Sequence, residues 1–293
     1  MIKLNGHVIE PTIFPDGTSQ VWKIGEYVAK PGHHCMPIQR VEWWFENEAE
    51  LMHLAQLKML LDKDGTCNAE LYMPYCPYAR QDKAIDDGQT FALSTFLGQL
   101  WGMHWSLIST IDMHNPDFVD QFDFNWQNNK MTPDVSRYDT VIFPDAGAAS
   151  RYDMDHPNIA IGHKVRDPKT GWITEYRVEG NVFGNVIVVD DLCDGGMTFE
   201  LLAKSIIRSD PEGIKRLDLS VTHGIFSKGL DKLCIYYDTI FTTNSFFGHT
   251  VRSGDNMLQL LEDAGDDGYN PKSHWYANLW KYVQQQQLVI EGV

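Results

Sequence analysis

Two adjacent carboxylates and a glycine-containing turn are the most informative part of the sequence. Asp190 and Asp191 follow a predicted strand over 185–189, and the segment Asp194–Thr198 (DGGMT) then opens a predicted helix. Glycines let backbone N–H groups approach an anion closely, and the helix N-terminus adds a partial positive charge. Carboxylates do not bind phosphate, but they hold ribose hydroxyls or a bridging Mg²⁺. The pattern favours a sugar-phosphate site; the alternative is an Asp-rich turn in which Asp194 or Thr198 caps the helix.

Other polar residues also follow predicted strands. Arg80, Gln81 and Asp82 come after a short strand and a proline-containing loop. His114 and Asp145 each follow a further apolar run. Ligands of open α/β sheets bind at the carboxyl ends of the strands. We therefore expect these side chains to face a ligand.

Alternating strands and helices position these residues. Apolar spacing predicts helices over 49–63, 90–102 and 198–207, and strands over 70–73, 107–111, 140–143, 185–189, 217–222 and 239–243. Strands separated by helices favour an α/β fold whose sheet is covered on both faces. The polar stretch 125–138 is a predicted boundary, which gives domains over 1–130 and 131–293.

Composition limits the compartment and the partners. The 293 residues are 43% hydrophobic and carry 24 basic against 40 acidic side chains, a formal net charge of −16. A large core is therefore possible, but a nonspecific grip on nucleic acid or an anionic membrane is not expected. Five widely spaced cysteines without a CxxC pair fit neither a disulfide framework nor a structural zinc site. This cysteine usage leads us to expect a reducing cytoplasm. No apolar run approaches the ~20 residues that span a bilayer, so we do not expect an integral membrane protein.

The motifs resemble a known family. Residues 189–198, V-D-D-x-x-D-G-G-x-T, are similar to the ribose-phosphate-binding motif of type I phosphoribosyltransferases and of ribose-phosphate pyrophosphokinases (PRPP synthetases). Residues 74–83 resemble the stretch P-Y-x-x-Y-A-R-Q-D-R/K, which the pyrophosphokinases carry and the transferases lack. The resemblance to the pyrophosphokinases covers roughly residues 48–250, in family order. It implies two phosphoribosyltransferase-like domains, each a mainly parallel sheet flanked by helices.

Further motifs carry roles that the resemblance implies. Asp112–Asn115 is similar to the D-L-H-A element, Phe143–Arg151 to S-P-D-x-G-G-x-x-R, and Gly162–Asp167 to the catalytic loop with K-R-R. The residues implied in catalysis are Lys164 and Arg166, and those implied in metal binding are His114 and Asp145. Thr222–Ser227 resembles T-H-x-x-F-S, which we interpret as structural.

Two groups of residues would bind the substrates. ATP would be bound by Phe14, Asp16, Arg80, Gln81, Asp82 and His114. The guanidinium fork of Arg80 and the carboxamide of Gln81 suit an adenine nucleotide. In the family, the counterparts of Phe14 and Asp16 reach the ATP of a neighbouring subunit. Ribose phosphate would be bound by Asp190, Asp191, Asp194, Gly195, Gly196, Met197 and Thr198.

The resemblance implies a transfer of the β,γ-diphosphoryl group of ATP to the C1 hydroxyl of ribose 5-phosphate, which gives PRPP and AMP. Mg²⁺, or Mn²⁺ in its place, would be required. We expect a homo-oligomer, from dimer to hexamer, and predict that Trp43, Trp44 and Phe45 form an apolar surface that a partner covers.

Other functions remain open. A sibling pyrophosphokinase would use another ribose acceptor, such as ADP-ribose, and the departures from the family pattern at Thr18, Val165 and Met197 leave room for it. A non-catalytic protein associated with PRPP synthetase would be expected to lose the loop lysine or the metal residues, which are present. A phosphoribosyltransferase would not carry the Arg80–Asp82 motif.

Overall fold

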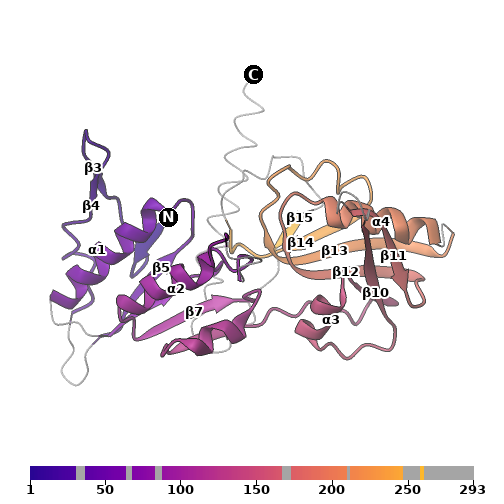
Figure 1. The fold of residues 1–293 in the computed structure, drawn as a ribbon, viewed down its shortest axis with the longest axis horizontal. Coiled ribbons are helices and arrows are strands. Elements are labelled where there is room, and N and C mark those ends of the chain that lie inside the picture. The colour runs from indigo at the N-terminus through magenta and orange to yellow at the C-terminus, as the bar shows by residue number, and fades with distance from the viewer. Residues whose placement is uncertain are drawn as a thin grey trace. The chain divides into compact units, whose positions relative to one another are not determined.

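The computed structural model describes residues 1–30, 37–63, 68–82, 88–166, 173–209, 212–246 and 258–260. They form two compact units: Met1–Lys130 with a short segment that begins at Ser245, and the rest of the chain from Met131 on. Each unit has its own sheet (Figure 1). None of the described helices is long and apolar enough to cross a membrane.

The sheet of the first unit is mainly parallel. Its order is β2 (His7–Val8), β1 (Ile2–Leu4), β5 (Gln39–Trp43), β6 (Ala69–Tyr72), β7 (Leu107–Ile111) and β8 (Trp126–Asn129). Strands β5 to β8 run parallel, whereas β1 is antiparallel to both β2 and β5. A separate hairpin of β3 (Thr12–Ile13) and β4 (Ser19–Gln20) projects from this unit (Figure 1).

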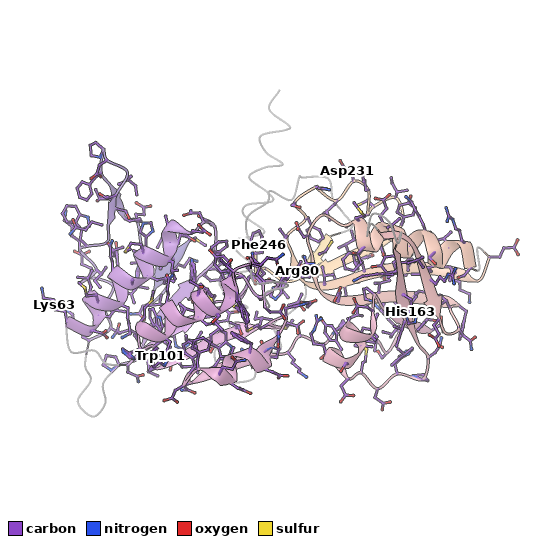
Figure 2. The ribbon with its side chains drawn as sticks, in the orientation of Figure 1. Lys63, Arg80, Trp101, His163, Asp231 and Phe246 are labelled. Atoms are coloured by element: carbon purple, nitrogen blue, oxygen red, sulfur yellow. The ribbon has the colours of Figure 1, made fainter. Side chains whose placement is uncertain are left out.

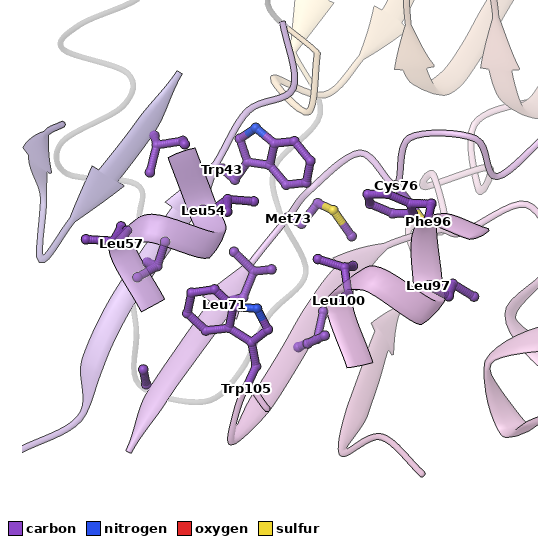
Figure 3. Packing of buried hydrophobic residues seen from close by; sticks show 14 of the residues in the cluster. Trp43, Leu54, Leu57, Leu71, Met73, Cys76, Phe96, Leu97, Leu100 and Trp105 are labelled. Atoms are coloured by element: carbon purple, nitrogen blue, oxygen red, sulfur yellow. The ribbon is translucent and has the colours of Figure 1, made fainter. Parts of the chain in front are cut away.

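Two helices supply the apolar side of this unit's core. Helix α1 (Ala49–Lys63) occupies the predicted range and buries Leu54, Leu57 and Leu61, a spacing that keeps them on one face. Helix α2 (Ala92–Gly102) begins two residues later than predicted and buries Leu93, Leu97 and Leu100. Figure 3 shows side chains from both helices packed with Leu71, Met73 and Trp43. A short 3₁₀ helix, η1 (Pro116–Gln121), follows β7.

The predicted apolar surface at Trp43, Trp44 and Phe45 is wrong. Trp43 is 0% and Trp44 2% exposed, and Phe45 packs against the core of the first unit. The indole Nε1 of Trp43 donates to Glu50 Oε2 on α1 at 2.9 Å. Trp43 is the last residue of β5, and its ring packs in the core between the sheet and its helices rather than against a partner chain.

The sheet of the second unit carries most of the predicted site. Its order is β11 (Ile173–Glu179), β10 (Ile159–Arg166), β9 (Thr140–Phe143), β12 (Gly184–Cys193), β13 (Ile214–Gly224), β14 (Thr239–Thr242) and β15 (Leu258–Leu260). All neighbours are parallel except β10 and β11, which form an antiparallel hairpin. Helix α3 (Ala146–Tyr152) follows β9, and helix α4 (Met197–Ser209) follows β12. Both sheets match the predicted α/β class.

Candidate active site

Strands β9 and β12 bring the predicted residues of the second unit to one edge of its sheet. Strand β9 lies between β10 and β12 and is parallel to both, so the carboxyl ends of the three strands lie together. Asp145 follows β9, Lys164 lies near the end of β10, and Asp190 and Asp191 lie near the end of β12. Arg166 is the last residue of β10, and the loop over 167–172 lies outside the described residues.

Lys164 and Asp145 form an ion pair. The Nζ of Lys164 donates to Asp145 Oδ2 at 2.9 Å, while Asp145 Oδ1 accepts the backbone N–H of Ala148 at 3.0 Å and so caps α3. Partial burial opposes ionisation of Asp145, but the hydrogen bonds from Lys164 and Ala148 outweigh it and lower the pKa of the carboxyl. Burial likewise opposes the charge of Lys164, yet Asp145 raises its pKa. Both groups are therefore charged at neutral pH.

Arg151 holds the two adjacent carboxylates. Its guanidinium makes a close ion pair with Asp191 and lies 3.7 Å from Asp190 Oδ1. Burial, and then repulsion from the neighbouring Asp191, raise the pKa of Asp190 well above its ordinary value. Arg151 was not among the predicted site residues, although it ends the motif Phe143–Arg151. The signal for it in the sequence was its place as the last residue of that motif.

The glycine-containing loop joins β12 to α4. Gly196 has a positive φ of +76°, a conformation that L side chains rarely adopt, and a Cβ there would lie 3.3 Å from Leu233. Ser227 donates to Asp194 and ties the loop to the segment after β13. Ser227 was interpreted as structural in sequence; its contact shows that it shapes this loop. Met197, the first residue of α4, is 49% exposed.

In the first unit, the loops after β6 and β7 carry the other predicted residues. These strands are parallel neighbours, so Arg80, Gln81 and Asp82 lie at the same edge as His114. Asn115, next to His114, donates to Asp82 Oδ2 at 2.9 Å. Arg80 and Gln81 are exposed, and Figure 2 shows the Arg80 side chain in the loop after β6. These exposed donors are available to a ligand.

Phe14 and Asp16 lie elsewhere in the first unit. They occupy the turn of the β3–β4 hairpin, which Figure 1 shows projecting away from β7. Asp16 Oδ1 accepts the N–H of Thr18 at 3.0 Å and its hydroxyl at 2.7 Å, and these bonds lower the pKa of Asp16. The structure therefore does not bring the hairpin residues together with His114 in one chain.

The residues present fit a divalent ion that arrives with a phosphate group. Within the described part of the chain, no three His, Cys, Asp or Glu side chains cluster closely enough to hold a metal ion by themselves. Asp145, Asp190 and Asp191 nevertheless supply hard oxygen donors at one sheet edge. Mg²⁺ binds through one or two carboxylates together with substrate phosphates and water. His114 belongs to the first unit and Asp145 to the second.

Two mainly parallel sheets, each flanked by helices, give the chain a two-unit fold of the phosphoribosyltransferase-like kind. A crystal structure of phosphoribosylpyrophosphate synthetase from Mycobacterium smegmatis matches the fold with a TM-score of 0.67 and 20% identity, over 98% of this chain and 91% of that one.

Curated relatives point to the same family. "Ribose-phosphate pyrophosphokinase" of Pyrococcus furiosus is 24% identical over 249 residues, 81% of this chain and 85% of that protein. "Ribose-phosphate pyrophosphokinase 2" of Schizosaccharomyces pombe is 29% identical over 73% of this chain and 72% of that protein. No protein-family model matches the chain. The resemblance read from the motifs is confirmed: the chain is a distant relative of the ribose-phosphate pyrophosphokinases.

Proposed function

We propose that the protein is a ribose-phosphate diphosphokinase, which transfers the β,γ-diphosphoryl group of ATP to the C1 hydroxyl of ribose 5-phosphate and releases PRPP and AMP. One observation carries the proposal. Two ion pairs, Lys164 with Asp145 and Arg151 with Asp190 and Asp191, stand at the sheet edge beside the loop that opens α4. Relatives named for this activity support it.

Ribose 5-phosphate matches the groups around Asp190. The backbone amides of Asp194–Thr198 and the start of α4 would hold the 5-phosphate, because a helix N-terminus favours an anion. Asp190 and Asp191 would accept hydrogen bonds from ribose hydroxyls. Asp190 is the carboxylate further from Arg151, at 3.7 Å. Its pKa is raised because Arg151 does not offset the effects of burial and of the charge on Asp191. A hydroxyl donor would supply the remaining compensation.

Lys164 would meet the charge that develops during transfer. Diphosphoryl transfer needs little covalent help from the protein, so positioning and cations supply most of the catalysis. In the structure Lys164 is held by Asp145 at 2.9 Å, which neutralises both groups. An anionic substrate would compete for Lys164, and Arg166, two residues further along β10, would join it.

Asp145 and His114 would hold Mg²⁺ on the phosphates. The ion supplies charge neutralisation on the transferred group when it is bound. Asp145 fits this role because its carboxylate is ionised and partly exposed. Arg80, Gln81 and Asp82 would bind ATP beside His114, and Phe14 and Asp16 would contact the ATP of a neighbouring subunit in a homo-oligomer.

A direct assay tests the reaction. The purified protein is incubated with ATP, ribose 5-phosphate and Mg²⁺, and the products are identified by mass. Formation of PRPP and AMP in equal amounts, abolished by excess chelator, is the expected result. ADP as the product, or full activity in chelator, would overturn the proposal.

ADP-ribose is the second candidate acceptor, and Met197 is the observation that favours it. This side chain stands where the family has glycine, and its 49% exposure places a flexible thioether at the phosphate loop. If the Met197 side chain closes the end of the acceptor pocket, ribose 5-phosphate is preferred. If it lines a wider pocket, the 5′-diphosphate of ADP-ribose can bind. The ratio of kcat/KM for the two acceptors decides. A tenfold preference for ADP-ribose, about 1.4 kcal/mol, would change the acceptor but leave the chemistry intact.

A further inference from the structure

Tyr176 lies beneath the charged side chains of the second unit. It is the Cα partner of Lys164 across the β10–β11 hairpin, so the two side chains project from the same face. Tyr176 is 1% exposed, and α4 packs against β11. The hydroxyl of Ser205, on α4, donates to the Tyr176 carbonyl oxygen at 2.8 Å and fixes this packing.

The Tyr176 hydroxyl is buried without a hydrogen-bond partner among the described residues. Burial raises the pKa of this hydroxyl, whereas the Thr198 and Lys164 side chains beside it lower the pKa. The hydroxyl therefore lies between the loop that opens α4 and the cation on β10, but completes a bond to neither. An unpaired buried hydroxyl is unfavourable, so its presence requires a reason.

Two other buried tyrosines of this unit have hydrogen-bonded hydroxyls. Tyr237 donates to the Phe199 carbonyl oxygen at 2.9 Å, and Tyr138 donates to Asp218 at 2.6 Å. A lack of partners is therefore not a general property of this core. Of these three tyrosines, the one beside Lys164 alone has a hydroxyl without a partner among the described residues.

We propose that Tyr176 is a positioning residue whose hydroxyl holds the Lys164 ammonium and the Thr198 hydroxyl in place when a ligand is bound. The inference rests on the proposed function, in which an anionic substrate draws Lys164 away from Asp145. A phenol accepts one hydrogen bond and donates another, so it can receive the ammonium while donating to Thr198. In the structure the Lys164 ammonium is directed to Asp145, at 2.9 Å, and not to the Tyr176 hydroxyl.

Tyr176→Phe isolates the hydroxyl, because the ring that fills the core is retained. We expect an unchanged or higher melting temperature, since an unpaired buried group is lost. We also expect kcat to fall about tenfold or more, with a smaller change in KM, because a hydrogen bond to a charged group disappears. Tyr237→Phe is the matched control: it removes a satisfied bond, so its melting temperature falls while kcat of the folded enzyme is kept.

A double-mutant cycle shows whether Tyr176 acts through Lys164. In a Lys164→Ala background, Tyr176→Phe should cause little further loss of kcat, because the group that it positions is absent. A multiplicative loss in the double variant would overturn the inference. So would wild-type kcat in Tyr176→Phe, or a fall in melting temperature that accompanies the loss of activity.

Binding of inorganic pyrophosphate separates this inference from the proposed function. If the wild-type protein makes no PRPP, the diphosphokinase proposal fails, and the affinity for pyrophosphate alone decides the role of Tyr176. Weaker binding by Tyr176→Phe, but not by the same substitution in Lys164→Ala, supports the positioning role. Equal binding by wild type and Tyr176→Phe overturns it.

Discussion

Opposite charges are paired within the site. Lys164 neutralises Asp145, and Arg151 pairs closely with Asp191 and more distantly with Asp190. Removing a partly buried ion from water is costly unless a partner replaces the water. A substrate that carries both phosphate and hydroxyl groups can replace both partners: its phosphate can pair with the cation, and its hydroxyls can donate to the carboxylates. Under the proposed function, this exchange would let an acidic protein accept anionic substrates through a few placed cations.

Lys164→Ala should lower kcat by about 10²-fold or more while the protein stays folded. One preorganised group at a developing negative charge contributes about 3–4 kcal/mol, by analogy with a lost oxyanion donor. Steady-state kinetics and a melting curve measure the two effects. Lys215→Ala is the control, because Lys215 is exposed near the amino end of β13. Near-normal turnover in Lys164→Ala would remove this residue from the mechanism.

Asp190→Asn should stabilise the protein at pH 8 while it lowers kcat/KM, because the raised pKa shows that the folded state disfavours the ionised carboxylate. The pKa of Asp190 is raised in the folded state, so its ionisation opposes folding above that folded pKa. As the pH falls through the folded-state pKa, Asp190 takes up a proton in the folded protein. The stability difference between Asp190→Asn and wild type then shrinks. The advantage is lost near the unfolded pKa of about 3.9.

Urea unfolding at several pH values measures this difference. Asp191→Asn is the matched control, because it removes the closer partner of Arg151 and should therefore destabilise the protein. A gain from Asp190→Asn that is independent of pH would contradict the assignment of the raised pKa.

At the residue scale, sequence reasoning proposed the groups with motif signals, and did not propose residues such as Arg151 and Tyr176 that tertiary contacts bring beside them. Asp145, Asp190 and Asp191 were predicted from their places after apolar strands, and Lys164 from the resemblance of its motif. Tyr176 is an aromatic residue in an otherwise polar stretch, and only its pairing with Lys164 across a hairpin places it at the site. Local spacing contains no information about that register.

At the element scale, the β10–β11 hairpin and the turn after β9 set the distance between Lys164 and Asp145. Gly162 lies two residues before Lys164 on β10, so a Cβ added at Gly162 would project from the same face as the Lys164 side chain. A Cβ at Gly162 would come within 2.8 Å of the Pro144 carbonyl oxygen and 3.3 Å of Leu202. The close approach of β10 to the residue before Asp145 therefore requires glycine.

Gly162→Ala should destabilise the second unit by about 1–3 kcal/mol and lower kcat, because β10 must move away from Pro144. Urea unfolding and kinetics measure both effects. Gly98→Ala is the control: a Cβ there meets nothing within 4 Å in α2, so it should stabilise by about 0.5–1 kcal/mol. Unchanged stability and turnover in Gly162→Ala would show that the hairpin tolerates the shift.

Helix prediction succeeded where apolar spacing was strong, and strand ends were predicted less well. Helix α1 matches its predicted range because its leucines repeat on one face. Strand β8 lies within the stretch predicted as a boundary, since a polar edge strand can bond through its side chains: Asn128 Oδ1 accepts the N–H of Met113 at 2.9 Å. Strand β12 runs to Cys193 because its pairing with β13 continues past the apolar residues.

At the scale of the whole molecule, Trp43 and Trp44 are buried and cannot contact a second copy of the chain. We expect the β3–β4 hairpin to make that contact instead. Ile13 is 62% and Phe14 39% exposed on this projecting element, which is a large apolar exposure for so short a segment. Exposed apolar groups that lie together are typical of interaction sites. Phe14 and Asp16 would reach a neighbouring ATP site only if a second copy is present.

The wild-type protein should therefore be a dimer or larger at micromolar concentration, and Ile13→Asp should weaken that assembly. A charge placed in a buried apolar contact is costly, so light scattering should show a smaller mass for the variant. Its KM for ATP should rise together with dissociation, because the hairpin of one subunit would contact the nucleotide of another. Met59→Asp is the control, since Met59 is 68% exposed on α1 and lies outside the hairpin; its mass and KM should match those of wild type. A fully active monomer, or an Ile13→Asp variant that keeps both its mass and its KM for ATP, would place the nucleotide site within a single chain.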